Sequence, residues 1–366
     1  MSAELDHQPD VQQSENESAI ASPEDLVGTV LAVQANYYWV QLGEKSLLCT
    51  RRSLLKKIGQ QVWVGDRVQV EEPDWAGGRG AIAQVFPRDS ELDRPPVANA
   101  DQILLVFALA DPTPEPLQLS RFLIKAESTG LEVCLGLNKR DLVSPEAQIE
   151  WGDRLQRWGY PAYLFSTQQK TGLDHLQTQL QQKITVISGP SGVGKSSLIN
   201  QLIPDVDLRV GSVSGKLGRG RHTTRHVELF ELPGGGLLAD TPGFNQPDLD
   251  CAPVELADYF PEARQRLEEA TCQFSNCLHR DEPNCAVRGD WERYEHYLVL
   301  LEEAIARQTQ LHQTTDQDSS MKLKTNQKGE SYYEPRLESK KYRRQSRRTQ
   351  HQNLDAMIWD TEAEDD

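Results

Sequence analysis

The chain has 366 residues, of which 37% are hydrophobic and 26% charged, and its formal net charge is −16 at pH 7. No uninterrupted apolar run reaches the ~18 residues of a membrane helix, and the acidic N-terminus lacks the apolar segment of a signal peptide. Six cysteines are too few for a disulfide scaffold in a chain that is long enough for several domains. These features argue against a membrane-spanning or disulfide-rich secreted protein, and we expect a cytoplasmic protein with no membrane partner.

The negative charge is unevenly distributed along the chain. Residues 1–25 contain seven acidic residues and no Lys or Arg, and their low apolar content predicts a disordered tail. Basic residues gather at 50–57, 216–226 and 339–348. Because local patches decide contact with phosphate backbones, the net charge does not exclude a nucleic-acid partner.

Residues 26–91 contain short β-like runs separated by turn residues. The runs are LVGTVLAVQ, YYWVQL, SLLCT, DRVQVEE and AIAQVF. Five short strands in a segment of this length predict a small closed barrel. An OB-fold is the preferred interpretation, and another small β-barrel is the alternative.

From residue 92 to 249, apolar strands alternate with helical stretches, as in a parallel sheet covered by helices. The run HVELFEL–PGGG–LLADTPG predicts a hairpin that returns to this sheet. Residues 250–315 are helical and contain a Cys/His cluster, and 316–366 predict a disordered tail with a basic segment. The fold class predicted is therefore multidomain α/β, with a barrel first and a helical domain last.

GPSGVGKS at 189–196 fits the phosphate-loop pattern and lies between the apolar strand ITVIS and the helix-like SSLINQL. Glycines let the backbone N–H groups wrap a β-phosphate at the helix N-terminus. Lys195 is expected to reach the β- and γ-phosphate oxygens, and Ser196 to hold Mg²⁺. The nucleotide-binding residues predicted here are Gly189, Pro190, Ser191, Gly192, Val193, Gly194, Lys195, Ser196 and Ser197.

Two further motifs point to a guanine nucleotide. In ADTPGF at 239–244, Asp240 is expected to meet Mg²⁺ through water, and the Gly243 N–H to meet the γ-phosphate. In NKRD at 138–141, the Asp141 carboxylate can accept both N1–H and N2–H₂ of guanine, a donor pair that adenine lacks. The combination predicts GTP or GDP and disfavours a guanylate kinase, which has a similar phosphate loop.

The remaining residues of the base site are less sharply defined. Asn138 can bond either the base edge or neighbouring loops, and the Lys139 stem can lie over the ring. Ser166 and Thr167, in FSTQQKTGL, are candidates for supporting the base. A plain strand-to-helix turn is the alternative for that stretch.

Four soft ligands lie close together in TCQFSNCLHRDEPNC: Cys272, Cys277, His279 and Cys285. Four Cys and His ligands suit tetrahedral Zn²⁺, and filling all four positions makes a structural site. The alternative is four unrelated buried side chains. Cys134, in an apolar strand, is expected in the core.

The order of the motifs is unusual, because NKRD precedes the phosphate loop and DTPG follows it. This is the order of circularly permuted GTPases. With the OB-like barrel, RPPVANADQ, GRHTT, DTPGF and the Cys/His cluster, residues 26–310 resemble the RsgA (YjeQ/YloQ) family. The resemblance implies a GTPase that binds the small ribosomal subunit, assists its late maturation and is stimulated by its rRNA.

Phe244 follows DTPG at the position where many GTPases have a water-orienting Gln, so unassisted hydrolysis is expected to be slow. By the family pattern, His222 in GRHTT is the candidate that orients water. An exposed His on a basic loop is the alternative. Thr224, with Thr223 as second choice, is the expected switch I threonine that senses Mg²⁺ and the γ-phosphate.

The barrel offers one candidate RNA-contacting surface and the zinc domain another. OB-folds commonly bind nucleic acid through basic and aromatic side chains, here Tyr37, Tyr38, Trp39, Arg51 and Arg52. Core packing is the competing explanation for the aromatic residues. The alternative function is a regulatory GTPase that acts on another RNA or protein, and a monomer is the default expectation.

Overall fold

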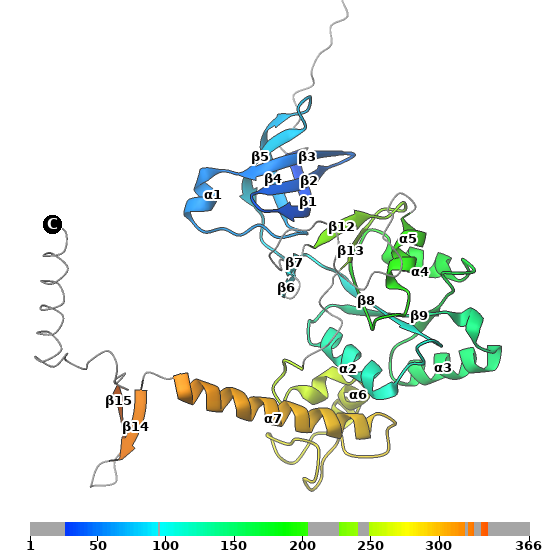
Figure 1. Cartoon of the computed structure of the whole chain (residues 1–366). Coiled ribbons are helices and arrows are strands. Elements are labelled where there is room, and N and C mark those ends of the chain that lie inside the picture. Colours follow the sequence, from blue (N-terminus) through cyan, green and yellow to red (C-terminus); the bar gives the residue numbers. More distant parts are fainter. Residues whose placement is uncertain are drawn as a thin grey trace, which may run out of the picture. The chain divides into compact units, whose positions relative to one another are not determined.

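The structure is a computed structural model and describes residues 26–93, 96–203, 227–240, 249–318, 321–325 and 331–335. The chain divides into two units, Met1–Leu301 and Glu302–Asp366. Figure 1 shows the order of its helices and strands. The predicted tail over 1–25 and the basic segment at 339–348 lie outside the described residues. None of the described helices combines the length and apolar character needed to cross a membrane.

The N-terminal strands close into a barrel. Its strands are β1 (Val27–Gln34), β2 (Tyr37–Leu42), β3 (Lys45–Arg51), β4 (Arg67–Asp74) and β5 (Arg79–Val85). Antiparallel pairs join β1 to β2 and β4, β2 to β3, and β4 to β5, and a parallel pair between β3 and β5 completes the circuit. Alternate residues such as Val30, Val40 and Ile82 are fully buried inside. A short helix, α1 (Ser53–Lys57), interrupts the meander after β3 and was not predicted.

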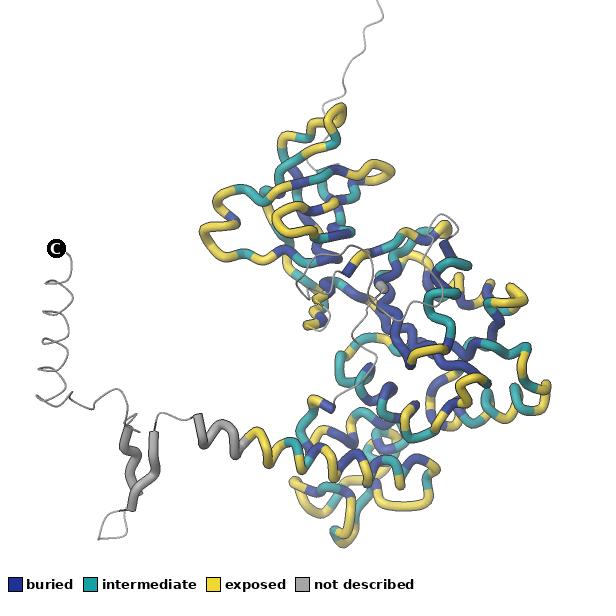
Figure 2. Tube along the Cα trace, in the orientation of Figure 1, coloured by how far each residue is buried: buried dark blue, intermediate teal, exposed yellow. Residues whose placement is uncertain are grey.

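The next part is a mostly parallel sheet in the order β10-β9-β8-β11-β13-β12, in which only β12 is antiparallel to its neighbour. Its strands are β8 (Gln102–Ala108), β9 (Glu132–Asn138), β10 (Ala162–Leu164), β11 (Ile184–Ser188), β12 (Glu228–Glu231) and β13 (Leu237–Asp240). Every residue of β8 is buried, as expected for a central strand with helices on both faces. Figure 2 shows the buried trace running through this sheet.

Helices cover both faces of the parallel sheet. α2 (Pro116–Glu127) and α3 (Pro145–Arg157) bury Phe122 and Leu155 in the core on one face. α4 (Leu173–Leu180) and α5 (Lys195–Leu202) bury Leu176 and Leu198 in the core on the other. The result is a three-layer α/β domain, as the alternation of elements predicted.

Two features between the barrel and the parallel sheet were not predicted. A small hairpin, β6 (Glu91–Asp93) and β7 (Pro96–Ala98), precedes β8. Strand β12 also pairs antiparallel with β1 of the barrel, with Ala32 opposite Glu228. The barrel and the α/β sheet are therefore hydrogen-bonded into one continuous sheet of 11 strands.

The chain then becomes helical, with η3 (Leu256–Tyr259), α6 (Pro261–Glu269) and α7 (Tyr294–Asp318). Within the segment 316–366, the described residues include an antiparallel pair of strands, β14 (Met321–Thr325) and β15 (Ser331–Pro335). In the register of this pair, Leu323 lies opposite Tyr333 and Lys322 opposite Glu334. The predicted domain boundaries remain predictions.

Candidate nucleotide and metal sites

The phosphate-loop and base motifs meet at one edge of the sheet. NKRD follows β9 and the phosphate loop follows β11, and β8 lies between these two strands. Because the three strands are parallel, their carboxyl ends lie together, which is where open α/β sheets bind ligands. Motifs that are far apart in the sequence therefore face the same crevice.

Two glycines of the phosphate loop occupy positions where a side chain would clash with neighbouring atoms. Gly189 has φ 140°, and a Cβ there would lie 2.0 Å from the carbonyl oxygen of Val106. Gly194 has φ 98°, and a Cβ there would lie 2.4 Å from Nδ2 of Asn138. The loop is thus pressed against the ends of its neighbouring strands and tolerates no side chain at either position.

Past the glycines, α5 begins at Lys195, so the loop ends at a helix N-terminus where backbone N–H groups are exposed to a ligand. The Lys195 ammonium donates to the carbonyl oxygens of Gly189 and Pro190, both at 2.7 Å. Its charge is thereby held at the mouth of the loop. Ser196 and Ser197 are partly buried in the first turn of α5.

Asn138 is fully buried and joins three loops. Its Nδ2 donates to the carbonyl oxygen of Val193 at 2.8 Å, and its Oδ1 accepts the backbone N–H of Thr167 at 3.1 Å. These bonds connect the NKRD loop to the phosphate loop and to the loop after β10. Of the two roles expected for Asn138, the contacts favour the support of neighbouring loops.

Lys139 and Asp141 are presented by a tight turn. Lys139 has φ 59° and its ammonium donates to the carbonyl oxygen of Asp111 in the loop after β8. Asp141 lies in the 3₁₀ turn η2 (Arg140–Leu142), and its Oδ1 is buried with no hydrogen-bond partner among the described residues. An unpaired buried carboxylate oxygen costs free energy unless a donor reaches it, so this atom fits a ligand that brings N–H groups.

The two supporting residues differ in their placement. Ser166 is fully buried, and its hydroxyl accepts the backbone N–H of Gln169 at 3.0 Å, so the side chain shapes its own loop. Thr167 is partly exposed, and its hydroxyl lies 3.3 Å from Nδ2 of Asn138. Thr167 therefore contacts Asn138, and its role in supporting the base remains a prediction.

Several predicted residues lie outside the described parts of the chain. They are His222, Thr223, Thr224, Gly243 and Phe244. Asp240 is described only as the last residue of β13, where it pairs with Ile187 of β11. The DTPG motif therefore begins next to the strand that enters the phosphate loop.

The Cys/His cluster has the dimensions of a tetrahedral zinc site. The ligand atoms of Cys272, Cys277, His279 and Cys285 all lie within 4.8 Å of one another. Nδ1 of His279 is 3.5 Å from Sγ of Cys272 and 3.4 Å from Sγ of Cys285, and these two sulfurs are 4.0 Å apart. Zn–S bonds of about 2.3 Å and Zn–N bonds of about 2.0 Å require separations of about 3.5–3.8 Å in a tetrahedron. The residues present therefore fit one Zn²⁺.

The surroundings of the cluster favour a metal over four neutral side chains. Without a metal, burial raises the pKa of Cys277 to about 12, which favours the neutral thiol, and it lowers the pKa of His279. Backbone N–H groups of Ala286 and Arg288 point at the sulfurs of Cys272 and Cys285, at 3.4 and 3.3 Å. These N–H donors would stabilise thiolates, and a bound divalent cation would offset the free-energy cost of burying the negative charges of the thiolates.

α7 holds the cluster loop from one side. The hydroxyl of Tyr294 donates to the carbonyl oxygen of His279 at 2.8 Å, and that of Tyr297 to Leu278 at 2.9 Å. The two rings are stacked, with 9° between their planes. Tyr294 and Tyr297 thus fix the backbone of the loop that carries the ligands.

The barrel candidates divide into inner and outer positions. Tyr38 is 3% exposed and belongs to the barrel core, whereas Tyr37 and Trp39 are 51% and 39% exposed on the same strand. Arg51 donates to the carbonyl oxygen of Gln60, and Arg52 pairs with two glutamates of β4. The outward Tyr37 and Trp39 are the stronger candidates for stacking on bases.

One contact at the nucleotide site and one buried residue near the helical domain gave no signal in the sequence. Asp111 acts through a backbone carbonyl, which no residue pattern reveals. Arg293 is fully buried between the α/β domain and α6, although an arginine is ordinarily expected at the surface. Cys134 is 4% exposed, which confirms its place in the core.

Comparisons with known proteins agree with this geometry. The RsgA GTPase family model matches residues 85–250. The small ribosomal subunit biogenesis GTPase RsgA of Trichormus variabilis is 66% identical, over 92% of this chain and 98% of its own length. A protein named small ribosomal subunit biogenesis GTPase RsgA 1, mitochondrial, of Arabidopsis thaliana is 41% identical, over 95% of this chain and 92% of its own length.

Solved structures show the same architecture. The crystal structure of YjeQ from Thermotoga maritima has a TM-score of 0.66 and 32% identity, and the match covers 77% of this chain and 99% of that one. The structure of YloQ, described as a circularly permuted GTPase, has a TM-score of 0.65 and 31% identity, with 77% and 95% covered. The predicted fold class is confirmed: an OB-fold barrel, a circularly permuted GTPase domain and a helical domain with a zinc-type cluster. The chain belongs to the RsgA GTPase family.

Proposed function

We propose that this chain hydrolyses GTP in the service of small-subunit biogenesis, binding the small ribosomal subunit and assisting a late step of its maturation. The observation that carries the guanine assignment is the buried Oδ1 of Asp141, which has no hydrogen-bond partner in the described part of the chain. The strand before it ends at the same sheet edge as the strand before the phosphate loop. The relatives that cover most of the chain are named as small ribosomal subunit biogenesis GTPases. The names of these relatives support the small ribosomal subunit as the partner, and the residues of the site support GTP as the substrate.

Separate groups of site residues bind the phosphates, Mg²⁺ and the guanine base. Gly189 to Ser197 cradle the phosphates, and Lys195 neutralises their charge from the mouth of the loop. Ser196, with Thr224 and Asp240, would hold Mg²⁺, which supplies charge neutralisation of the β- and γ-phosphates when bound. Asp141 accepts the N1–H and N2–H₂ groups of guanine, while Lys139, fixed by Asp111, lies along the ring.

Hydrolysis itself needs a group that orients water. Phe244 cannot hydrogen-bond to it, so His222 and the Gly243 N–H are assigned to the water and the γ-phosphate. In this proposal the subunit rRNA completes or orders that arrangement, and the exposed Tyr37 and Trp39 of the barrel are among the RNA contacts. The zinc domain is the second RNA-contacting part.

GTP hydrolysis by the purified protein is expected to be slow alone and to rise with small ribosomal subunits by on the order of 10²-fold or more, as when a partner completes other GTPase sites. Phosphate release is measured alone, with small subunits and with large subunits, and ATP serves as the control nucleotide. Equal turnover in all three conditions would remove the ribosomal part and favour a regulatory GTPase with another partner.

Replacing Asp141 with Asn is expected to weaken GDP binding by about 100-fold, because the carboxylate accepts two charge-assisted hydrogen bonds. The amide can instead donate to the 2-oxo group of xanthine and accept its N1–H, so binding of xanthosine diphosphate should rise. Calorimetry with both nucleotides measures the exchange. Asp153→Asn is the matched control, since Asp153 is an exposed residue of α3. Unchanged GDP affinity in Asp141→Asn would remove the base assignment.

A further inference from the structure

The turn that carries Asp141 is held from behind by one side chain of α3. Nε2 of Gln148 donates to the carbonyl oxygens of Arg140 and Val143, at 3.0 and 3.4 Å. These two carbonyls flank Asp141 and Leu142, so a single amide fastens both ends of the turn. The 3₁₀ turn itself has only three residues, and few hydrogen bonds of its own define its direction.

Arg140 adds a second contact on the same side. Its Nη1 lies 3.5 Å from the carbonyl oxygen of Leu164, the last residue of the edge strand β10. Its backbone N–H donates to the carbonyl oxygen of Phe165 at 3.3 Å. The turn is therefore tied to the loop that carries Ser166 and Thr167 as well as to α3.

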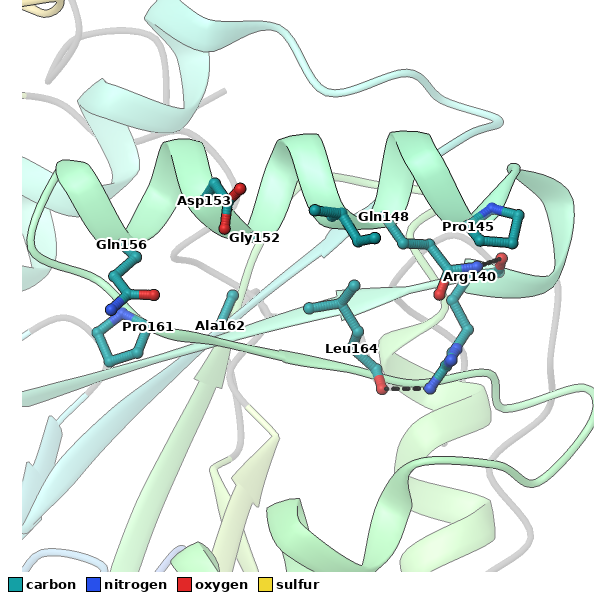
Figure 3. Close-up of a pocket in the computed structure, with 10 residues that line it drawn as sticks. Arg140, Pro145, Gln148, Gly152, Asp153, Gln156, Pro161, Ala162 and Leu164 are labelled. Atoms are coloured by element: carbon teal, nitrogen blue, oxygen red, sulfur yellow. Dashed lines mark hydrogen bonds between the residues drawn. The ribbon is translucent and has the colours of Figure 1, made fainter.

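Both contacts line a pocket of about 540 Å³ between α3 and β10 (Figure 3). Figure 3 shows Gln148 and Leu164 converging on Arg140 at one end of this pocket, while Gln156 lies at the other end. The turn that carries Asp141 is therefore held by side chains and carbonyls that line or adjoin this pocket.

The Gln148 amide is not needed to begin its own helix. α3 starts at Pro145, and the Ser144 hydroxyl caps it by accepting the N–H of Ala147 at 3.3 Å. The amide instead donates to carbonyl oxygens of the turn that precedes the helix. A residue that served only the helix would have no reason to reach back to these carbonyls.

We propose that Gln148 and Arg140 are positioning residues for guanine recognition, which fix the direction of the Asp141 carboxylate from the rear of the turn. The inference rests on the proposed role of Asp141. Hydrogen bonds lose strength steeply as donor and acceptor move out of line, so a turn that is free to tilt loses the guanine-specific bonds first. Phosphate contacts, which belong to the loop after β11, are left in place.

Gln148→Met tests this in the full-length protein, because methionine has a similar length and helix propensity but no N–H donor. Affinities for GDP and inosine diphosphate are compared, since inosine keeps N1–H and lacks the 2-amino group. The wild type should prefer GDP by about tenfold or more, the value of one charge-assisted bond. In Gln148→Met the preference should fall by about fivefold, mainly through weaker GDP binding.

Gln156→Met is the matched control, because it makes the same change on the same helix at the far end of the same pocket. It should keep the wild-type preference. An unchanged GDP-to-inosine-diphosphate ratio in Gln148→Met, or an equal fall in both variants, would overturn the proposal. A wild type that binds GDP and ADP equally would refute the Asp141 assignment itself, and the positioning role with it.

Discussion

Replacing Cys277 with Ser in the full-length protein is expected to reduce bound zinc from one ion per chain to nearly none and to unfold the ligand loop. Cys277 is 7% exposed, and its sulfur belongs to a cluster whose atoms lie within 4.8 Å of one another. A structural zinc site contributes ~10 kcal/mol or more to the folding of small zinc modules. The effect should therefore be the largest that a single substitution has in this part of the chain.

The same variant should leave the nucleotide site intact. The phosphate loop and α5 are fixed by a separate core, which includes Val193, Leu198 and Leu202. GDP affinity and unassisted GTP hydrolysis are expected to stay near wild-type values, whereas stimulation by small subunits should be lost. Together, GDP affinity, unassisted GTP hydrolysis and stimulation by small subunits distinguish loss of the zinc module from loss of the nucleotide site.

Zinc content is measured by elemental analysis, and loop order by hydrogen exchange of the amides around residues 270–293. Cys251→Ser is the control, because Cys251 lies outside the cluster and the change of side chain is identical. Retention of one zinc by Cys277→Ser would contradict the assigned ligand set. Loss of GDP binding would contradict the independence of the two sites.

The parts that the sequence indicates most directly are those whose chemistry restricts both residue type and spacing. The phosphate loop needs glycines where Val106 and Asn138 approach, and a metal needs its four soft ligands close in the chain or in space. Here both requirements are met by local segments, so the pattern is visible without the fold. The barrel and the alternating α/β elements are visible for a related reason, since burial imposes a period on each element.

The order of the motifs did not obstruct the prediction, because a sheet depends on which strands are neighbours. β9, β8 and β11 lie side by side whatever their order in the chain, and their carboxyl ends form one edge. Moving the chain termini therefore preserves the site as long as the strand neighbours are preserved.

What was missed depends on contacts that no local pattern encodes. The carbonyl of Asp111 holds Lys139, and any residue type supplies a carbonyl. Asn138 had two chemically reasonable roles, and only the position of Val193 and Thr167 favours one of them. α1 is too short to show a helical period, and the strand pair β14–β15 lies in a polar segment whose alternation is weak.

DTPG leads within a few residues into 250–310, so hydrolysis there could reposition these residues. The structure shows what such a movement has to overcome. Lys125 of α2 pairs with Asp250 at 2.8 Å, and Glu127 accepts a hydrogen bond from Arg264 at 2.7 Å. Arg154 and Trp158 both donate to the carboxylate of Glu292. The helical domain is thus held on α2 and α3 by polar contacts, and Arg293 also bonds both parts, through Glu262 and the carbonyl oxygen of Trp158.

Arg293 is fully buried and is surrounded by groups from both domains. Its Nε donates to Glu262 at 2.8 Å, and its guanidinium lies 4.9 Å from the ring centres of both Trp158 and Phe260. Its Nη1 is buried without a hydrogen-bond partner among the described residues, so aromatic faces supply part of its stabilisation. The charge is therefore balanced chiefly by one carboxylate and three rings, the third being Tyr160.

Arg293→Met is expected to lower the free energy of unfolding by about 3–5 kcal/mol, because it leaves the Glu262 carboxylate in a largely buried position without its partner. Adding Glu262→Leu removes that unpaired charge, so the double variant should regain most of the loss, as replaced buried ion pairs commonly do. Denaturant unfolding followed by tryptophan fluorescence measures both. Arg288→Met, at an exposed position of the same domain, should change stability by less than about 0.5 kcal/mol.

The comparison of the single and double variants decides what Arg293 contributes. If the double variant recovers stability but responds less to small subunits, the ion pair sets the relative position of the two domains and hydrophobic packing alone does not. If it recovers both, the interface needs only to be filled, and the position of the zinc domain is fixed by the surrounding contacts of Glu127 and Glu292. Equal losses of stability in the single and double variants would contradict the assigned pairing, because removing the unpaired Glu262 carboxylate would then have restored none of the free energy of unfolding.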